Sequence, residues 1–186
     1  MVTDEQLVED SLAGSALAFS ELVERYQERL LRYLVTRSGN RADAEDAVQD
    51  TFISAYRYLY SYNPRWAFST WIYRIAIRNA GRQSRREVSD VTDIADDGAP
   101  DPLEECIVAS ERENVWLTAK RLLNQDAYAA MWLRYVEDMS IKEVARALDK
   151  TQSWTKVTLL RGRRSLSSEL AESASAAAQR ESYGRI

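Results

Sequence analysis

The chain has 186 residues, of which 45% are hydrophobic and 29% are charged. This composition is typical of a folded globular protein with one ordinary domain or two small ones. The sequence has no histidine and a single cysteine, Cys106, so we exclude an internal disulfide, a multi-cysteine metal site and histidine-dependent catalysis. No segment approaches the ~20 apolar residues that cross a bilayer, and the acidic N-terminus does not resemble a secretory signal. We therefore expect a cytoplasmic protein without a membrane segment.

The net charge of −4 is the sum of three zones that differ in sign. Residues 51–86 contain seven arginines and no acidic residue, and residues 150–168 contain five basic residues and no acidic one. Between them, residues 87–113 contain ten acidic residues and one arginine. Charged runs are usually solvated faces, but basic zones also supply the sequence-independent part of nucleic-acid affinity. Two such zones, each beside further nucleic-acid signals, favour a DNA- or RNA-binding protein.

The first two predicted helices have clear start and stop signals. Thr3 and Gln6 form a capping box before a short helix. Gly39 ends the second helix, and Asn40 can cap a third. The second helix has apolar residues at the 3.6-residue period of one buried face: Phe19, Leu22, Val23, Tyr26, Leu30, Tyr33 and Leu34.

A loop at Asn63-Pro64 separates the third predicted helix, which ends near residue 60, from a fourth that spans about residues 68–86. The apolar faces of these two helices contain Ala44, Val48, Phe52, Ala55, Trp71, Ile72, Ile75 and Ala76. Nine of the 18 aromatic residues lie between residues 52 and 73. We expect Phe52, Trp71 and Tyr56 in the core, whereas the loop region is too short to bury all of Tyr58, Tyr60, Tyr62, Trp66 and Phe68. Exposed aromatic rings beside arginines are typical of surfaces on which unpaired bases stack.

The second half of the chain is predicted to begin with an acidic linker over residues 87–110. This stretch is polar, has no hydrophobic periodicity, and contains acidic side chains that repel one another. Asp101-Pro102 is a start signal for a helix that reaches Leu123. A helix over residues 124–136 follows, with three candidate core residues: Met131, Leu133 and Tyr135.

The end of this half has the pattern of a helix-turn-helix. Ser140 and Glu143 form a second capping box, residues 149–151 form a short turn, and a basic helix begins near Gln152. A simple helical bundle can have the same spacing, so the pattern alone does not distinguish a DNA-binding helix-turn-helix from such a bundle. We expect an all-α fold: two small helical domains, residues 1–86 and 111–170, joined by the acidic linker, with the helix-turn-helix in the second. A low-complexity tail, residues 171–186, extends the last helix.

Two segments resemble one protein family. Residues 123–166 resemble region 4, the −35-reading domain, of bacterial sigma factors of the extracytoplasmic-function (ECF) group, in the stretch LNQDAYAAMWLRYVEDMSIKEVARALDKTQSWTKVTLLRGRRSL. Residues 43–86 resemble region 2 of the same family, and the two segments occur in the family's order and separation. The resemblance implies a transcription factor that binds core RNA polymerase, recognises −35 duplex DNA and opens the −10 element of a promoter. It implies no cofactor and no covalent chemistry, and it implies an anti-sigma factor as a further partner.

The resemblance also assigns residues to each task. In the family, the loop that matches residues 61–68 captures a flipped −10 base, and the helix after it holds the adjoining DNA. The resemblance therefore implies these −10 DNA-binding residues: Tyr62, Asn63, Trp66, Phe68, Arg74, Arg78, Asn79, Arg82, Arg85 and Arg86. In the last helix, Lys156, Val157 and Leu160 match positions that face −35 bases, and Arg161, Arg163 and Arg164 are expected to contact phosphates. Several positions depart from the family. Asn79 lies one residue after the usual asparagine, Asp149 replaces the usual turn glycine, and Asn124 replaces the usual proline. Trp154, Thr155 and Thr158 also differ from the residue types that are usual at their positions.

An acidic stripe on the third helix has three interpretations. Asp43, Asp46 and Asp50 lie on one side of the helix, with Gln49 beside them. Such a cluster can bind a hard cation, or it can be an ordinary exposed acidic face. The resemblance adds docking on the clamp of the polymerase's largest subunit, with the flap as a second contact, and we favour docking because complementary charge speeds association and fixes register.

Two other functions compete with the sigma-factor interpretation. A stand-alone helix-turn-helix regulator would bind duplex DNA tightly without polymerase, usually at two half-sites. A helical, metal-dependent phosphohydrolase would use the acidic helix. The absence of histidine and of paired carboxylates on a second helix argues against that enzyme.

Overall fold

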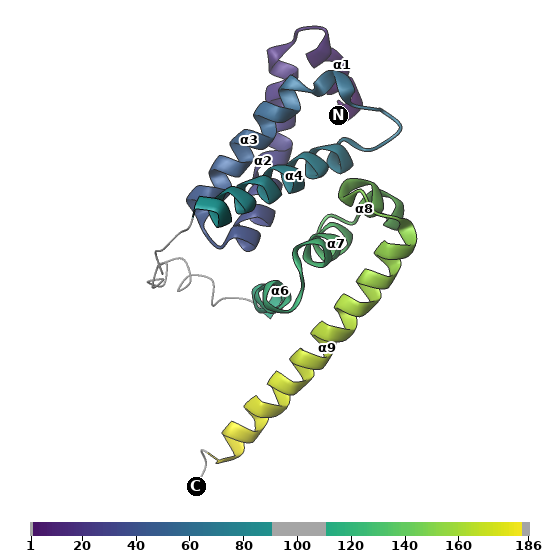
Figure 1. Cartoon of the computed structure of the whole chain (residues 1–186). Coiled ribbons are helices and arrows are strands. Elements are labelled where there is room, and N and C mark those ends of the chain that lie inside the picture. Colours follow the sequence, from purple (N-terminus) through teal and green to yellow (C-terminus); the bar gives the residue numbers. More distant parts are fainter. Residues whose placement is uncertain (1, 91–110, 184–186) are drawn as a thin grey trace.

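The computed structural model describes residues 2–90 and 111–183, with side chains for residues 2–81 and 115–172. Every regular element in these ranges is a helix, which confirms the predicted all-α fold. Figure 1 shows two groups of helices, which we call the first lobe (residues 2–90) and the second lobe (residues 111–183). Within the described residues, no helix is both long enough and apolar enough to cross a membrane.

The first lobe consists of four α-helices and one short 3₁₀-helix. Their bounds are α1 Asp4–Leu12, α2 Ala16–Ser38, α3 Arg41–Arg57, η1 Leu59–Ser61 and α4 Phe68–Asp90. α3 therefore ends before the predicted boundary near residue 60, and the short 3₁₀-helix follows it. α4 extends past Arg86 to Asp90, so the first residues of the predicted linker are helical. The rest of that linker, including the predicted helix start at Asp101-Pro102, lies outside the described residues.

The helix ends follow the local signals of the sequence. Thr3 Oγ1 accepts a hydrogen bond from the backbone N–H of Gln6, whose side chain accepts one from the N–H of Thr3, so the predicted capping box is confirmed. Gly39 ends α2 with a φ of 82°, a left-handed conformation that glycine adopts without strain. Asn40 then caps α3 by accepting a hydrogen bond from the N–H of Ala42.

The core of the first lobe is formed mainly by the residues that helical periodicity predicted. Those that are buried include Leu22, Tyr26, Leu30, Tyr33, Leu34, Ala44, Phe52, Ala55, Ile72 and Ala76. The expectation that Tyr56 belongs to the core is wrong, because its side chain is 60% exposed. The buried stripe of α3 ends with Thr51, Phe52 and Ala55. Tyr56 lies at its edge, where its ring packs against Phe19 with centroids 4.9 Å apart.

The second lobe contains the helix-turn-helix. Its helices are α6 Glu111–Leu122, α7 Gln125–Tyr135, α8 Ile141–Leu148 and α9 Gln152–Tyr183. Ser140 and Glu143 form the predicted capping box at the start of α8. Met131 and Leu133 are buried as expected, whereas Tyr135 is exposed because it lies in the last turn of α7, on the side away from the core. α9 runs away from the other helices, and its second half projects beyond them (Figure 1).

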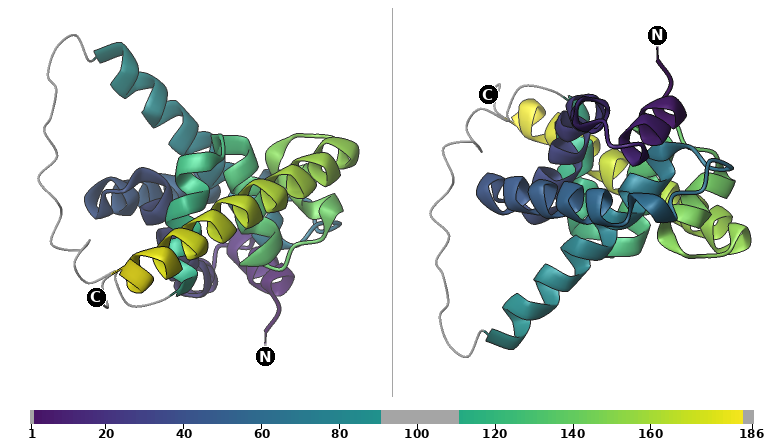
Figure 2. Two further views of the ribbon diagram at one scale, coloured as in Figure 1. Left: turned by 90° about the horizontal axis from the view of Figure 1, so that it is seen from below. Right: turned by 90° about the horizontal axis from the view of Figure 1, so that it is seen from above.

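The two lobes pack against each other through an aromatic seam. Tyr33 of α2 contacts Tyr128 and Trp132 of α7, with ring centroids 6.4 and 5.8 Å apart, and Tyr33 also meets Tyr73 of α4. Beside the seam, Arg29 Nε donates to Glu137 Oε2 over 3.0 Å, and the Glu137 side chain is only 1% exposed. The views from below and above in Figure 2 show α6–α9 stacked on one side of α2–α4. The two lobes of the described chain are therefore in direct contact.

Candidate nucleic-acid interface

A groove of about 540 Å³ lies between α3, the loop of residues 62–67 and α4. We call it the loop groove. Its wall includes the aromatic rings of Tyr58, Trp66 and Trp71 and the side chains of Arg74 and Arg78. Aromatic faces and cations in one groove are the combination that holds single-stranded nucleic acid, because bases stack on the rings and phosphates approach the cations.

The loop at the mouth of this groove is held by its own hydrogen bonds. The hydroxyl of Tyr62 donates to the carbonyl oxygen of Trp66 over 2.7 Å, and the N–H of Trp66 donates to the carbonyl oxygen of Asn63 over 3.1 Å. Burial, followed by the charges of Glu5 and Asp4, raises the pKa of Tyr62 to about 12, so the phenol stays neutral and remains a donor. Trp66 is therefore presented on an ordered turn.

Phe68 does not belong to the groove surface, contrary to its assignment from the sequence. Its side chain is 1% exposed, and its ring lies between those of Tyr26, Tyr62 and Trp71, with centroids 5.2 to 5.8 Å apart. The periodicity contains the signal for this burial, because Phe68 precedes Ile72 by four residues on the apolar face of α4. Phe68 supports the loop from inside, and its ring is not accessible to a base in this structure.

The polar residues of α4 are divided between the groove and the packing of the lobe. Arg74, Arg78 and Asn79 all line the groove, and the amide of Asn79 also donates to the carbonyl oxygen of Asp50 and to Ser54 Oγ, each over 3.3 Å. Asn79 thus joins α4 to α3 at the edge of the groove. The side chains of Arg82, Arg85 and Arg86 lie outside the described residues, although the backbone of α4 continues through them.

The acidic stripe of α3 is only partly exposed. Asp46, Gln49 and Asp50 face solvent, whereas Asp43 is half-buried. Asp43 lines a second cavity, of about 230 Å³, together with Lys120 of the second lobe. Among the described residues, no three His, Cys, Asp or Glu side chains gather closely enough to hold a metal ion. The face available to a partner is therefore the one formed by Asp46, Gln49 and Asp50.

The basic helix α9 presents all six residues of its predicted site to solvent. Val157 and Leu160 are 45% and 40% exposed, and Lys156, Arg161, Arg163 and Arg164 are also exposed. The opposite face of α9 buries Thr155, Leu159 and Leu166, which the sequence analysis did not identify. Their spacing of four and seven residues is a helical stripe, so the signal was present. Exposed apolar side chains beside cations suit the major groove, where thymine methyl groups lie next to base acceptors and phosphates.

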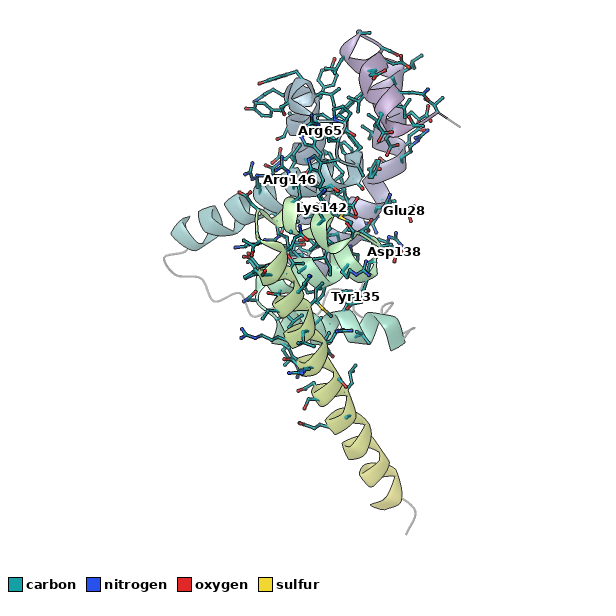
Figure 3. The ribbon with its side chains drawn as sticks, turned by 90° about the vertical axis from the view of Figure 1, so that its right-hand side faces the viewer. Glu28, Arg65, Tyr135, Asp138, Lys142 and Arg146 are labelled. Atoms are coloured by element: carbon teal, nitrogen blue, oxygen red, sulfur yellow. The ribbon has the colours of Figure 1, made fainter. Side chains whose placement is uncertain are left out.

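The second lobe also contributes residues to the loop groove, which the sequence analysis did not foresee. Arg146 of α8 is part of its wall. Lys142 Nζ and Arg146 Cζ lie 4.9 and 5.2 Å from the centroid of the Trp66 ring, close enough for cation–π attraction. Figure 3 shows Lys142 and Arg146 where α8 meets the first lobe. No sequence signal pointed to these contacts, because they join residues that are far apart along the chain.

Comparisons with known proteins agree with one another. Residues 22–89 match the family model for Sigma-70 region 2. The chain is 32% identical over 184 residues to the ECF RNA polymerase sigma-E factor of Haemophilus influenzae, which covers 91% of this chain and 96% of that protein. It is 31% identical over 182 residues to the ECF RNA polymerase sigma-E factor of Escherichia coli K12, covering 91% of this chain and 95% of that protein.

Solved structures share the fold. One is CnrH in complex with the cytosolic domain of CnrY, with a TM-score of 0.69, 23% identity, and coverage of 91% of this chain and 97% of that chain. Another is the sigma factor RpoE of Bartonella quintana in complex with the anti-sigma factor NepR, with a TM-score of 0.65, 21% identity, and coverage of 82% and 96%.

This chain belongs to the ECF group of RNA polymerase sigma factors. It is a transcription initiation factor, which acts with RNA polymerase. These relationships do not favour a stand-alone regulator.

Proposed function

We propose that the two lobes divide promoter recognition between them: the loop groove and α4 open and hold the −10 element, and α9 reads the −35 duplex. The observation that supports this most strongly is the loop groove itself, where Trp66 stands on an ordered turn beside Arg74 and Arg78. A stacking face next to two cations fits a base that has left the duplex together with its flanking phosphates.

In the proposed −10 site, a base flipped from the non-template strand enters the loop groove. Extruding a base costs a few kcal/mol, which stacking and polar contacts in the pocket must offset. Tyr62 and Asn63 hold the turn, Trp66 offers its ring, and Arg74 and Arg78 hold the backbone. Arg82, Arg85 and Arg86 extend the same helix, and we assign them to the adjoining DNA.

In the proposed −35 site, α9 lies in the major groove. Lys156 donates to guanine acceptors, and Val157 and Leu160 meet thymine methyl groups. The arginines at 161, 163 and 164 contact phosphates and set the orientation of the helix. Their exposure in the described chain supports these roles.

The exposed acidic face of α3, formed by Asp46, Gln49 and Asp50, is the proposed docking surface for the clamp of the polymerase's largest subunit. Asp43 lies at the edge of this surface and supports it. The flap is the proposed partner of the second lobe. RNA synthesis is carried out by the polymerase in the cytoplasm, and this chain contributes binding and strand opening with no covalent step.

An anti-sigma factor is a further proposed partner. CnrH and the RpoE of Bartonella quintana, which share the fold, were solved in complex with the cytosolic domain of CnrY and with the anti-sigma factor NepR. We expect a comparable regulator to bind this chain and to block its access to polymerase.

Transcription in vitro with purified core polymerase and fragmented genomic DNA tests the proposed function. The chain should direct initiation from defined promoters, and their sequences should share a −35 and a −10 element. Trp66→Ala should reduce permanganate reactivity at the −10 element by about five- to a hundredfold, because stacking of one base is worth roughly 1–3 kcal/mol. Trp154→Ala, at a tryptophan outside the loop groove, is the matched control and should leave opening intact once the promoter is bound. Initiation that does not depend on the chain would contradict the proposal.

A further inference from the structure

The second cavity, of about 230 Å³, lies where helices of both lobes meet, and we call it the junction cavity. Its wall is formed by the last turns of α2, the first turns of α3, the end of α6 and the start of α7, with Ala80 of α4 beside them. It shares no lining residue with the loop groove. Apart from Asp43, at the edge of the proposed docking surface, the proposed function uses none of its residues.

Two cationic side chains of the junction cavity have no carboxylate partner among the described residues. Arg37 Nη1 donates to Tyr33 Oη over 3.3 Å, and Arg37 Nη2 donates to Gln125 Oε1 over 3.0 Å, so these bonds go to neutral groups. No described carboxylate lies within 4.0 Å of the charged nitrogens of Arg37 or Lys120. A guanidinium and an ammonium group in one cavity, without a counter-charge at contact distance, favour an anionic ligand.

The backbone makes room for the lysine at this cavity. An ideal Cβ on Gly39 would lie 2.8 Å from Lys120 Nζ, a separation shorter than van der Waals contact. Because glycine has no Cβ, the ammonium group can rest against the turn between α2 and α3. A charge from the second lobe is thereby brought to a cavity whose other walls include α2 and α3 of the first lobe.

The hydroxyl group of Tyr128 supplies a third polar group. Tyr128 is 3% exposed and lines the cavity, yet its Oη has no hydrogen-bond partner among the described atoms. Burial raises the pKa of this phenol, so it stays protonated and can donate a hydrogen bond. A buried hydroxyl group without a partner costs free energy. An anion that also contacts Arg37 would supply the missing acceptor.

The size of the cavity and its remaining walls indicate an organic ligand and not a bare ion. A volume of about 230 Å³ corresponds to roughly seven waters at about 30 Å³ each, which is more than one phosphate ion fills. Alanine and leucine side chains supply apolar surface for a carbon skeleton. The half-buried carboxylate of Asp43 repels a second anionic group and can accept hydrogen bonds from hydroxyl groups.

We propose that the junction cavity binds a small phosphorylated metabolite, whose phosphoryl group is held by Arg37, Lys120 and Tyr128 and whose hydroxyl groups face Asp43. The ligand contacts α2 and α3 of the first lobe and α6 and α7 of the second. The inference does not rest on the proposed roles of the loop groove and α9, because it uses no residue of either DNA-binding site.

Calorimetric titration of the full chain with glycerol 3-phosphate, in a phosphate-free buffer at constant ionic strength, tests the site. We expect saturable binding at a single site. Inorganic phosphate should bind about three- to tenfold more weakly, because it lacks the carbon skeleton. Glycerol, which has no phosphoryl group, should give no saturable heat. Equal affinities for the two phosphate compounds, or no saturable binding of glycerol 3-phosphate, would contradict the proposed ligand class.

Lys120→Gln should weaken the binding of glycerol 3-phosphate about tenfold, because it removes a charge-assisted hydrogen bond to the phosphoryl group. Lys120 is exposed, so the fold should stay intact. Arg121→Gln is the matched control, with the same change in charge at the next residue of α6. Arg121 is exposed and pairs with Glu169 of α9, so its replacement should leave the affinity unchanged.

Tyr128→Phe distinguishes a ligand contact from a structural role, because it removes only the hydroxyl group. The free energy of unfolding in urea should stay the same or rise, since Tyr128 Oη has no hydrogen-bond partner in the described chain. The affinity for glycerol 3-phosphate should fall about tenfold or more, because a hydrogen bond to a charged group is lost. An affinity that neither Lys120→Gln nor Tyr128→Phe changes would overturn the inference. Failure of promoter-directed initiation would instead contradict the proposed function and leave these affinities unaffected.

Discussion

At the scale of single residues, the loop groove depends on one buried ring as much as on the rings that line it. Trp66 is presented to the groove, and Phe68, two residues later, is enclosed by Tyr26, Tyr62 and Trp71. Composition did not separate these two aromatic residues, because both lie in the same aromatic- and arginine-rich stretch. Their positions distinguish them: Trp66 lies on the turn of the loop, and Phe68 lies in the first helical turn of α4.

Phe68→Ala should therefore behave as a core mutation. We expect a loss of about 3–5 kcal/mol in the free energy of unfolding, because a large ring is removed from a filled space. Urea denaturation followed by circular dichroism measures it. Phe68→Leu should retain most of the stability and normal promoter opening. A stable Phe68→Ala protein with a specific defect in opening would show instead that the ring contacts DNA.

At the scale of elements, α3 and α9 each present one face to the core and one to a partner. The exposed face of α3 contains Asp46, Gln49 and Asp50. α9 buries Thr155 and Leu159 and exposes its cations. Helical periodicity predicted the helices and most buried positions, because burial follows the 3.6-residue period closely. It did not predict the exposure of Tyr56 and Tyr135. The burial of a residue at the edge of an apolar stripe, or in the last turn of a helix, depends on which other elements pack against it.

Asp50→Arg should weaken binding to core polymerase without unfolding the chain, because Asp50 is exposed and the change reverses a charge on the proposed docking face. Glu45→Arg is the matched control on the same helix, with the same change in charge at another exposed position. Surface-immobilised polymerase and a salt titration measure both affinities. Equal losses for the two variants would show that net charge, and not the face of Asp46, Gln49 and Asp50, determines binding.

Lys156→Ala should change which −35 sequences are preferred, since a side chain that contacts base edges contributes about 1–3 kcal/mol of discrimination. Arg163→Ala should lower affinity by a similar factor for all sequences, because phosphate contacts do not distinguish bases. Selection of bound duplexes from a randomised −35 library by the holoenzyme measures both effects. An unchanged sequence profile for Lys156→Ala would assign base reading to other residues of α9.

At the scale of the whole molecule, the lobes share a core that the sequence did not reveal. Sequence patterns predicted the helices, the two basic zones and the helix-turn-helix, because each of these features depends on residues that are close together along the chain. The seam joins Tyr33 to Tyr128 and Trp132 across roughly half the chain length. Its existence depends on complementary shape between lobes, which no local pattern encodes. The same holds for Asp149 in the turn after α8, whose ion pairs with α4 form only when the lobes are in contact.

A shared core predicts how the chain unfolds. The described lobes should unfold in urea in one cooperative transition, because separating them exposes the seam and leaves the buried Glu137 without Arg29. Glu137→Ala should weaken this coupling, since removal of one partner of a largely buried ion pair leaves the other without its counter-charge. The expected result for this variant is two separate unfolding transitions. Tryptophan fluorescence reports the transition of the seam, and circular dichroism reports the unfolding of all helices. Coincident transitions with an unchanged slope in both proteins would show that the Arg29–Glu137 pair does not couple the lobes.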